Sequence, residues 1–267
     1  MKHRIQISEE LWSRIQPLLP EAKRSPKGGR PRLDDRHALN GIVFVLSTGI
    51  PWEDLPQEMG CGSGMTCWRR LRDWQEAGVW QQLHQLLLDE LRQTGKLDLS
   101  RASIDGACVA KPPGGSETGP NPTDRGKLGS KRHLITDRNG IPLTLCVTGA
   151  NRHDSIVFET LVDALPAIRG KRGRPLRWPA KLHADKAYDC QRCRNHLRER
   201  GIKSRIARKG IESKERLGRY RWVVERTHAW LAAMGKLRTR FERRLDTHLA
   251  LLCLGCCVIC IRQLTRF

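Results

Sequence analysis

The sequence has few acidic residues for its length and no hydrophobic run long enough to cross a membrane. Only 28 residues are aspartate or glutamate, against 49 lysines and arginines. The longest apolar run, HLALLCLGCCVICI, spans 14 residues, whereas a membrane helix needs about 20. No apolar segment typical of a signal peptide lies near Met1. We therefore expect a cytoplasmic protein without a membrane partner, in which the apolar run forms a buried helix.

The excess of positive charge, +21 over 267 residues, indicates a polyanionic partner. Nucleic acid is the leading candidate, although a ribosomal-type or merely basic protein would show the same charge. The chain has no repeat at a fixed period and is long enough for two domains with a hydrophobic core each. A change from helical to strand-like patterns near residues 95–100 predicts a boundary between residues 1–97 and residues 98–267.

The ten cysteines include three CxxC spacings, which begin at Cys190, Cys253 and Cys257. Such spacings bind zinc when two of them stand on turns with polar flanks. Here two of them follow directly on each other within the apolar run, where Cys253, Cys257 and Cys260 follow the i, i+4, i+7 spacing of one helix face. We expect reduced thiols that pack as small hydrophobic side chains, and not a zinc site.

The first part of the chain shows the pattern of an all-α domain. SEELWSRIQPLLP begins at Ser8, a typical helix N-cap, and DDRHALNGIVFVLSTG begins at two aspartates and ends at Gly49. Between them, KRSPKGGRPR contains five basic residues and no acid. Arg30 and Arg32 of this arm are candidates to contact DNA phosphates or to enter a minor groove. A solvated basic linker would have the same composition.

The next stretch matches the helix-turn-helix pattern of DNA-binding domains. IPWEDLPQEMG predicts a short helix, CGSG a turn, and MTCWRRLRDWQEAG a second helix that Ser63 caps and Gly78 ends. Residues 65–77 then form the recognition helix, with Leu71 and Trp74 packed inward. Its three arginines become candidates for DNA contacts: Arg69, Arg70 and Arg72. Arginines on one helix are also common on purely solvated surfaces.

From residue 101 onward the patterns alternate between strands and helices. The turn residues DRNG, between two apolar stretches, predict a β-hairpin. The predicted order is strand, hairpin, helix, strand, helix, strand, helix, carried in turn by RASIDGACVAK, KRHLITDRNGIPLTLCVTGA, HDSIVFETLVDALPAI, KLHADKAYD, QRCRNHLRERG, IKSRIAR and a helix that begins near Arg219. This order predicts an α/β domain with a mixed sheet flanked by helices.

Three acids occupy unusual positions in this second part. Asp105 lies within an otherwise apolar strand, Asp185 ends another, and Glu225 lies on the helix that follows the sheet. We expect Glu225 to share the buried stripe of that helix, which we assign to Trp222, Ala229 and Ala233. If the strands are neighbours and the helix covers their ends, the three carboxylates converge. Such oxygen ligands suit Mg²⁺ and metal-assisted attack on a phosphodiester.

Each of these acids also has an ordinary structural explanation. The partners would be Arg221 and Arg226 for Glu225, the turn at Gly106 for Asp105, and Lys186 for Asp185. Asp189 and Asp154 compete with Asp185 for the second position, but both stand where a helix is expected to begin, so capping explains them. His153 could approach the site, although we favour a structural role for it.

Beyond these residue types, the sequence resembles the transposases of the insertion sequence 5 family. The resemblance covers almost the whole chain and rests on collinear phrases: TGIPWEDLP, CWRRLRDWQEAGVW, IDGACVAK, NPTDRGKLGSKRHL, ANRHDS, ADKAYD and RWVVERTHAWL. In the wider group the glutamate stands in a Tyr-x2-Arg-x3-Glu-x6-Lys signature. Arg221 fits this signature, whereas Gly218 and Ala232 occupy its Tyr and Lys positions.

The resemblance implies a ribonuclease H-like domain with a catalytic and metal-binding triad of Asp105, Asp185 and Glu225. It implies Mg²⁺, for which Mn²⁺ can substitute, and double-stranded DNA as the partner, with terminal repeats and target DNA both bound. Arg221 and Arg226 would then belong to the DNA channel. It also implies a bacterial, nucleoid-associated protein that forms a homodimer or a higher oligomer on DNA.

Three functions compete at this point. The leading hypothesis is an enzyme that cuts the ends of an insertion sequence and joins them to target DNA. A ribonuclease H-like nuclease or resolvase would cut without joining. A DNA-binding protein without catalytic chemistry, such as a domesticated transposase, would not need the three acids.

Overall fold

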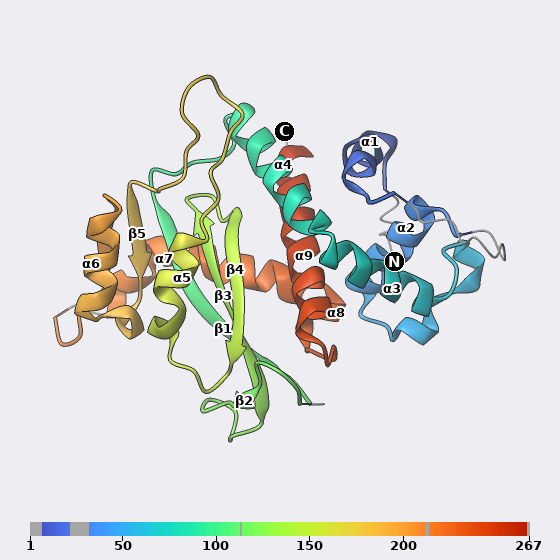
Figure 1. Ribbon diagram of the computed structural model, residues 1–267. Coiled ribbons are helices and arrows are strands. Elements are labelled where there is room, and N and C mark those ends of the chain that lie inside the picture. Colours follow the sequence, from blue (N-terminus) through green and yellow to red (C-terminus); the bar gives the residue numbers. More distant parts are fainter. Residues whose placement is uncertain (1–6, 22–31, 113, 212–213, 266–267) are drawn as a thin grey trace.

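The computed structural model of the protein describes residues 7–21, 32–112, 114–211 and 214–265. A group of helices and a mixed β-sheet stand side by side, with two long helices, α4 and α9, crossing between them (Figure 1). The sequence-based expectation of a helical region followed by a mixed α/β domain is confirmed.

The helical region forms where the sequence places its caps. Ser8 accepts a hydrogen bond from the backbone N–H of Leu11, and Asp34 accepts from those of Arg36 and His37. Gly49 ends its helix with a φ of 81°, a conformation that favours glycine. The elements are α1 (Glu9–Ile15), η1 (Gln16–Leu18), α2 (Asp35–Thr48), η2 (Trp52–Asp54), η3 (Gln57–Met59), α3 (Gly64–Glu76) and α4 (Val79–Gln93).

The sheet has six strands and mixes parallel with antiparallel pairs. The strands are β1 (Ala102–Ala110), β2 (Gly119–Pro120), β3 (Leu128–Asp137), β4 (Pro142–Gly149), β5 (Lys181–Ala184) and β6 (Lys203–Ile206). Their order is β2-β3-β1-β5-β6, and β4 pairs with β3. The pairs of β1 with β5 and of β5 with β6 are parallel, whereas β3 pairs antiparallel with β1, β2 and β4. The predicted mixed sheet is therefore confirmed.

The hairpin of β3 and β4 turns at the predicted DRNG sequence. The carboxylate of Asp137 accepts hydrogen bonds from the backbone N–H groups of Asp98, Asn139 and Ile141. Gly140 completes the turn with a φ of 83°. One side chain thus satisfies three backbone donors and fixes the register of β3 against β4.

Helices cover both faces of the sheet. In Figure 1, α5 lies in front of the strands and α7 passes behind them. The elements of this part are η4 (Asp154–Val157), α5 (Phe158–Asp163), η5 (Lys186–Tyr188), α6 (Gln191–Glu199), α7 (Lys214–Ala232), α8 (Gly235–Arg238) and α9 (Leu245–Thr265).

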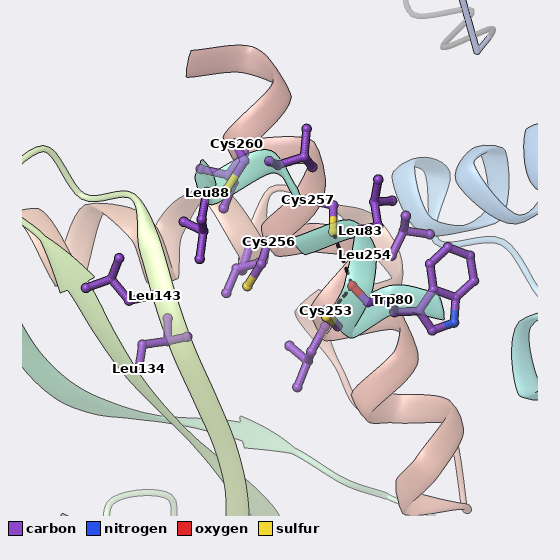
Figure 2. Packing of buried hydrophobic residues seen from close by; sticks show 14 of the residues in the cluster. Trp80, Leu83, Leu88, Leu134, Leu143, Cys253, Leu254, Cys256, Cys257 and Cys260 are labelled. Carbon is purple, nitrogen blue, oxygen red and sulfur yellow. Dashed lines mark hydrogen bonds between the residues drawn. The ribbon is translucent and has the colours of Figure 1, made fainter. Parts of the chain in front are cut away.

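Helix α9 contains the apolar run and is longer than the run itself, with 21 residues. By length and composition it is the single helix of the described chain that could cross a membrane, but 67% of its most apolar window is buried inside the protein. It packs along α4, and Figure 2 shows Trp80, Leu83 and Leu88 of α4 beside its cysteines. A core helix explains the apolar run.

The cysteines of α9 pack as predicted. Cys253, Cys256, Cys257 and Cys260 are all buried, and the thiols of Cys253 and Cys257 lie 3.3 and 3.9 Å from the carbonyl oxygen of Trp80, to which they donate. These thiols therefore act as small core side chains with a backbone acceptor.

We expect protein purified without added zinc to contain far less than one zinc ion per chain, because these thiols face the core and stay protonated. Burial raises the pKa of Cys256 and Cys257 well above the ordinary range of a thiol. Elemental analysis of the purified protein checks this, and a zinc content near one per chain would contradict the packing role.

His84 joins the helical region to the sheet and should make stability depend on pH. Its Nε2 lies 2.9 Å from the carbonyl oxygen of Pro142 in β4, and burial lowers its pKa to about 4. Because this pKa lies below the unfolded value of about 6.5, the stabilisation is complete above pH 6.5 and is lost as the pH falls from there toward 4.

The variant His84→Gln keeps an N–H donor for Pro142 and does not titrate. Between pH 7 and pH 5 we expect the wild-type protein to lose about 2 kcal/mol more stability than this variant. Urea unfolding at the two pH values measures the difference, and equal losses would show that His84 does not carry it.

Candidate active site

Asp105 lies on β1, and Asp185 directly follows the neighbouring strand β5. Strands β1 and β5 run parallel, and Ser103 is the partner of His183. Each aspartate follows its paired residue by two positions, so both reach the same level of the sheet. The hydroxyl of Ser103 donates to the backbone carbonyl of Tyr220 in α7, at 3.1 Å. Because side chains two apart share a face of a strand, Asp105 faces α7 as well.

Arg221 connects the third acid to this pair. Its Nη2 lies 3.7 Å from Oδ1 of Asp105 and 3.9 Å from Oε1 of Glu225. A single nitrogen of Arg221 thus neighbours both carboxylates. The bridge that we considered between Glu225 and Arg221 is present, whereas Arg226 donates to the carbonyl of Asn139 and stacks over the rings of Trp222 and Trp230.

The predicted buried stripe of α7 is wrong. Trp222, Ala229 and Ala233 are exposed, and the side chain of Glu225 is 58% exposed. The buried face carries Val223, Val224, Thr227, His228 and Leu231. The β-branched residues pack on the sheet, while the guanidinium of Arg226 covers the outer face of Trp222. Glu225 therefore lies at the rim of the site and not in its floor.

The side chain of Asp105 is 19% exposed and is therefore much more buried than that of Glu225. Burial raises the pKa of Asp105 to about 6, with Arg221 acting to lower it and Asp185 and Glu225 to raise it. Asp185 itself accepts a hydrogen bond from the backbone N–H of Ala187, at 2.9 Å. A buried carboxylate with two like charges nearby is unfavourable unless a cation is close, and Arg221 is the cation that this arrangement supplies.

The donor set fits a hard divalent cation in chemistry, because all three groups are carboxylates. As they stand, however, no three Asp, Glu, His or Cys side chains of the described residues are grouped tightly enough to hold one ion. Asp105 and Asp185 are fixed by the sheet, whereas Glu225 is exposed and has a longer side chain. Metal binding would therefore need Glu225 to move inward and Arg221 to move aside.

Asp154 lies beside Gly106 of β1, although it was expected to cap its own helix. His153 provides that cap, since its ring nitrogen accepts from the backbone N–H of Ser155. Oδ1 of Asp154 lies 2.9 Å from Nζ of Lys131, and a Cβ on Gly106 would come within 2.8 Å of the same oxygen. Lys131 was not among the predicted site residues, and its only signal in the sequence is the phrase GSKRHL.

A buried tyrosine completes the surroundings of the acids. The hydroxyl of Tyr188 is buried and has no hydrogen-bond partner among the described residues. Burial raises its pKa, with Asp154, Asp105 and Asp185 adding to the effect. Tyr188 stands three residues after Asp185 in the phrase ADKAYD, which was the sequence signal for it.

Asp189 has a structural role that differs from the expected one. Helix α6 begins without a side-chain cap. Instead, Asp189 pairs with Arg194 at 2.6 Å and accepts from the backbone N–H of Lys209 at 2.8 Å. It thereby holds the segment after β6, away from the three candidate acids.

The arginines proposed for DNA fall into different environments. Arg70 is 6% exposed, pairs with Asp35 and donates to the carbonyl of Leu33, so its side chain is held within the protein, which argues against a contact with DNA. Arg69 is exposed. Arg32 is exposed and pairs with Asp35, Arg72 pairs with Asp73 and Glu76, and Arg30 lies outside the described residues.

The helix-turn-helix pattern is only partly matched. Ser63 caps α3 by accepting from the N–H of Thr66, and Leu71 and Trp74 are fully buried, as expected. IPWEDLPQEMG, however, forms two 3₁₀ turns, η2 and η3, because its prolines interrupt a regular helix. The helix before α3 is therefore α2.

A helical region followed by a mixed sheet, with one acid on a strand, one at the end of the adjacent strand and one on a later helix, is the architecture of DDE transposases. Residues 96–261 match the family model "Transposase DDE domain", and residues 7–84 match "Putative transposase of IS4/5 family". The chain belongs to the IS4/5 family of DDE transposases.

Relatives support the same assignment. The chain is 54% identical over 153 residues to the "Putative transposase for insertion sequence element IS402" of Burkholderia cepacia, which covers 57% of this chain and 72% of the relative. It is 53% identical over 118 residues to the "Insertion element IS402 uncharacterized 16.2 kDa protein" of the same species, a match that covers 43% of this chain and 80% of the relative. The "Transposase for insertion sequence element IS1106" of Neisseria meningitidis serogroup B is 32% identical over 115 residues, which cover 39% of this chain and 36% of the relative.

Proposed function

We propose that this transposase cuts the ends of an insertion sequence and joins them to target DNA by metal-dependent hydrolysis and transesterification of phosphodiesters. The observation that carries the proposal is the placement of Asp105 and Asp185 at one level of adjacent parallel strands, with Glu225 and Arg221 above them on α7. The IS402 and IS1106 relatives, whose names describe transposases, support it.

Asp105, Asp185 and Glu225 would hold Mg²⁺, or Mn²⁺ in its place, which when bound activates a water or a 3′-hydroxyl and stabilises the leaving oxygen. The chain itself contributes position and charge. The sheet fixes the two aspartates, α7 carries the glutamate, and Arg221 exchanges its carboxylate partners for a phosphate of the bound strand. This exchange frees Asp105 and Glu225 to act as ligands.

Double-stranded DNA is the proposed partner, both as element ends and as target. Residues 1–97 would bind the ends, through Arg69 and Arg72 of α3 and through the arm that contains Arg30 and Arg32. Arg221 and Arg226 would contact the strand at the site, while residues 98–267 carry the chemistry. We propose a cytoplasmic, nucleoid-associated protein that works as a homodimer or a higher oligomer on DNA.

The test mixes the purified full-length protein with DNA that carries the ends of its own element, a target plasmid and Mg²⁺. We expect cleaved ends and joined products, and neither product when the metal is chelated. Cleaved ends without joined products would favour a nuclease or resolvase. Specific binding without any cleavage would favour a non-catalytic DNA-binding protein.

A further inference from the structure

A strongly basic cavity of about 760 Å³ opens beside Arg221, along β5, β6 and α7. β6 is an edge strand of the sheet, and its neighbour β5 lies on the side of the sheet away from α4 and α9 (Figure 1). None of the described residues that line the cavity is acidic, whereas six besides Arg221 are lysine or arginine: Arg101, Arg138, Lys181, Arg194, Arg205 and Arg208. The cavity therefore has the charge of a site for a polyanion.

Much of this charge has no counter-charge. Within the described part of the chain, Lys181, Arg205 and Arg208 form no ion pair, whereas Arg138 and Arg194 pair with Asp98 and Asp189. His183 also lines the cavity, among these cations. A cation cluster of this kind is costly until an anion enters.

Hydrogen-bond donors in the cavity also lack partners. Nε of Arg101, Oγ of Ser204 and Nε of Arg221 are buried, and none of them has a hydrogen-bond partner in the parts of the chain that the structure describes. Buried donors are usually satisfied. Three unsatisfied donors around one cavity indicate a ligand that brings acceptor oxygens.

An aromatic ring lies among these cations. Tyr220 lines the cavity and is 39% exposed. Its ring centroid lies 5.1 Å from that of His183, and the guanidinium of Arg101 lies 5.0 Å from it. Cations that follow a sugar-phosphate backbone, together with an aromatic ring for a base, are the pattern of single-strand binding sites.

We propose that this cavity binds a single strand of DNA adjacent to the scissile phosphate, with phosphates on Lys181, Arg205 and Arg208 and a base against Tyr220. The donor atoms of Ser204 and Arg101 are buried. A rigid duplex could not reach them, whereas a single strand could. The inference rests on the proposed function only for the position of the strand relative to the cut.

The test measures binding of a labelled oligothymidylate of about ten nucleotides to the full-length protein without divalent metal. In the double variant Lys181→Gln/Arg205→Gln, two phosphate contacts are lost. We expect roughly 20-fold weaker binding near 0.1 M salt and a slope of log K against log salt that is smaller by about 1.4, since each contact with a single strand contributes about 0.7. The matched control is Lys171→Gln/Arg172→Gln, which removes the same charge from an exposed loop and should bind as wild type.

A second pair of variants separates stacking from charge. Tyr220→Ala should weaken oligothymidylate binding about tenfold, whereas Tyr220→Phe should keep it, because a base stacks on either ring. Affinity for duplex DNA should change little in all of these variants. If both double variants weaken binding equally, or if duplex binding falls as much as single-strand binding, the proposal is overturned.

A competition experiment with inorganic phosphate separates a strand site from a simple anion site. If free phosphate at the same phosphate concentration displaces the oligonucleotide fully, the cavity is an anion site and not a strand site, and the proposal is wrong. Failure of cleavage in the Mg²⁺ assay, with these binding results intact, would reject the proposed function alone. Normal cleavage with unchanged oligothymidylate binding in the double variant would reject the strand site alone.

Discussion

Asp105→Asn, Asp185→Asn and Glu225→Gln are each expected to abolish cleavage of element ends, by at least about a thousandfold, while DNA binding stays largely intact. Amides keep the shape of the carboxylates and remove the charge that holds the metal. Affinity comes mainly from lysine and arginine contacts with phosphate, which these changes leave in place. Gel assays of cleavage and binding on the same DNA measure both quantities.

The control is Asp189→Asn, four residues after Asp185. Its carboxylate pairs with Arg194 and accepts from the backbone of Lys209, so its loss should reduce stability slightly and retain substantial cleavage. Double variants of the three acids should be hardly worse than the singles, because the ligands act as one unit. Ca²⁺, which is larger and more loosely coordinated, should support binding without turnover.

The decisive comparison is between Glu225 and Asp189. If Glu225→Gln cuts as well as wild type while Asp189→Asn is inactive, the assignment of the third acid is wrong. Because Glu225 is exposed and lies at the rim of the site, it is also the acid for which the experiment is most informative.

Arg70→Gln should destabilise the protein by about 3 kcal/mol, because the Asp35 carboxylate loses its buried partner and keeps only the exposed Arg32. Arg70 is 6% exposed, and its guanidinium also donates to the carbonyl of Leu33, which precedes α2. It therefore ties α3 to the start of α2. Urea unfolding measures the loss.

Arg69→Gln is the matched control, one residue earlier on the same helix and exposed. It should change stability by less than about 0.5 kcal/mol and should weaken binding to element ends, with a salt slope smaller by about 0.9 for one lost phosphate contact with duplex DNA. The opposite pattern, with Arg70→Gln stable and defective in binding, would restore Arg70 as a DNA contact.

Sequence patterns predicted the elements that depend on local signals. Ser8, Gly49 and the DRNG turn act within a few residues of themselves, so their effect can be read from the sequence. The positions of Asp105 and Asp185 were also predictable, because an acid within or at the end of an apolar strand has few alternatives. Their convergence followed from the parallel pairing of β1 with β5.

Contacts between distant segments were not predictable in this way. The partner of Arg70 is 35 residues away, and nothing in RRLRDW distinguishes it from its exposed neighbour Arg69. Trp222 looked like a core residue by composition, but Arg226 covers it on the outside of α7. The residues that line the basic cavity come from β5, β6, α7 and the segments around them. No single stretch of sequence therefore predicts it.

Because α9 packs on α4, the core between them can form only after α9 has been synthesised. Cys253 meets the carbonyl of Trp80 across 173 residues of sequence, and a ribosome that adds about 5–20 residues per second takes roughly 9–35 s to make them. During that interval the apolar face of α4, with Leu83, Leu87 and Leu88, has no α9 to cover it. The nascent chain therefore exposes this face to chaperones and proteases until α9 has been made. We expect the yield of folded protein to depend on chaperones that bind α4 during this interval.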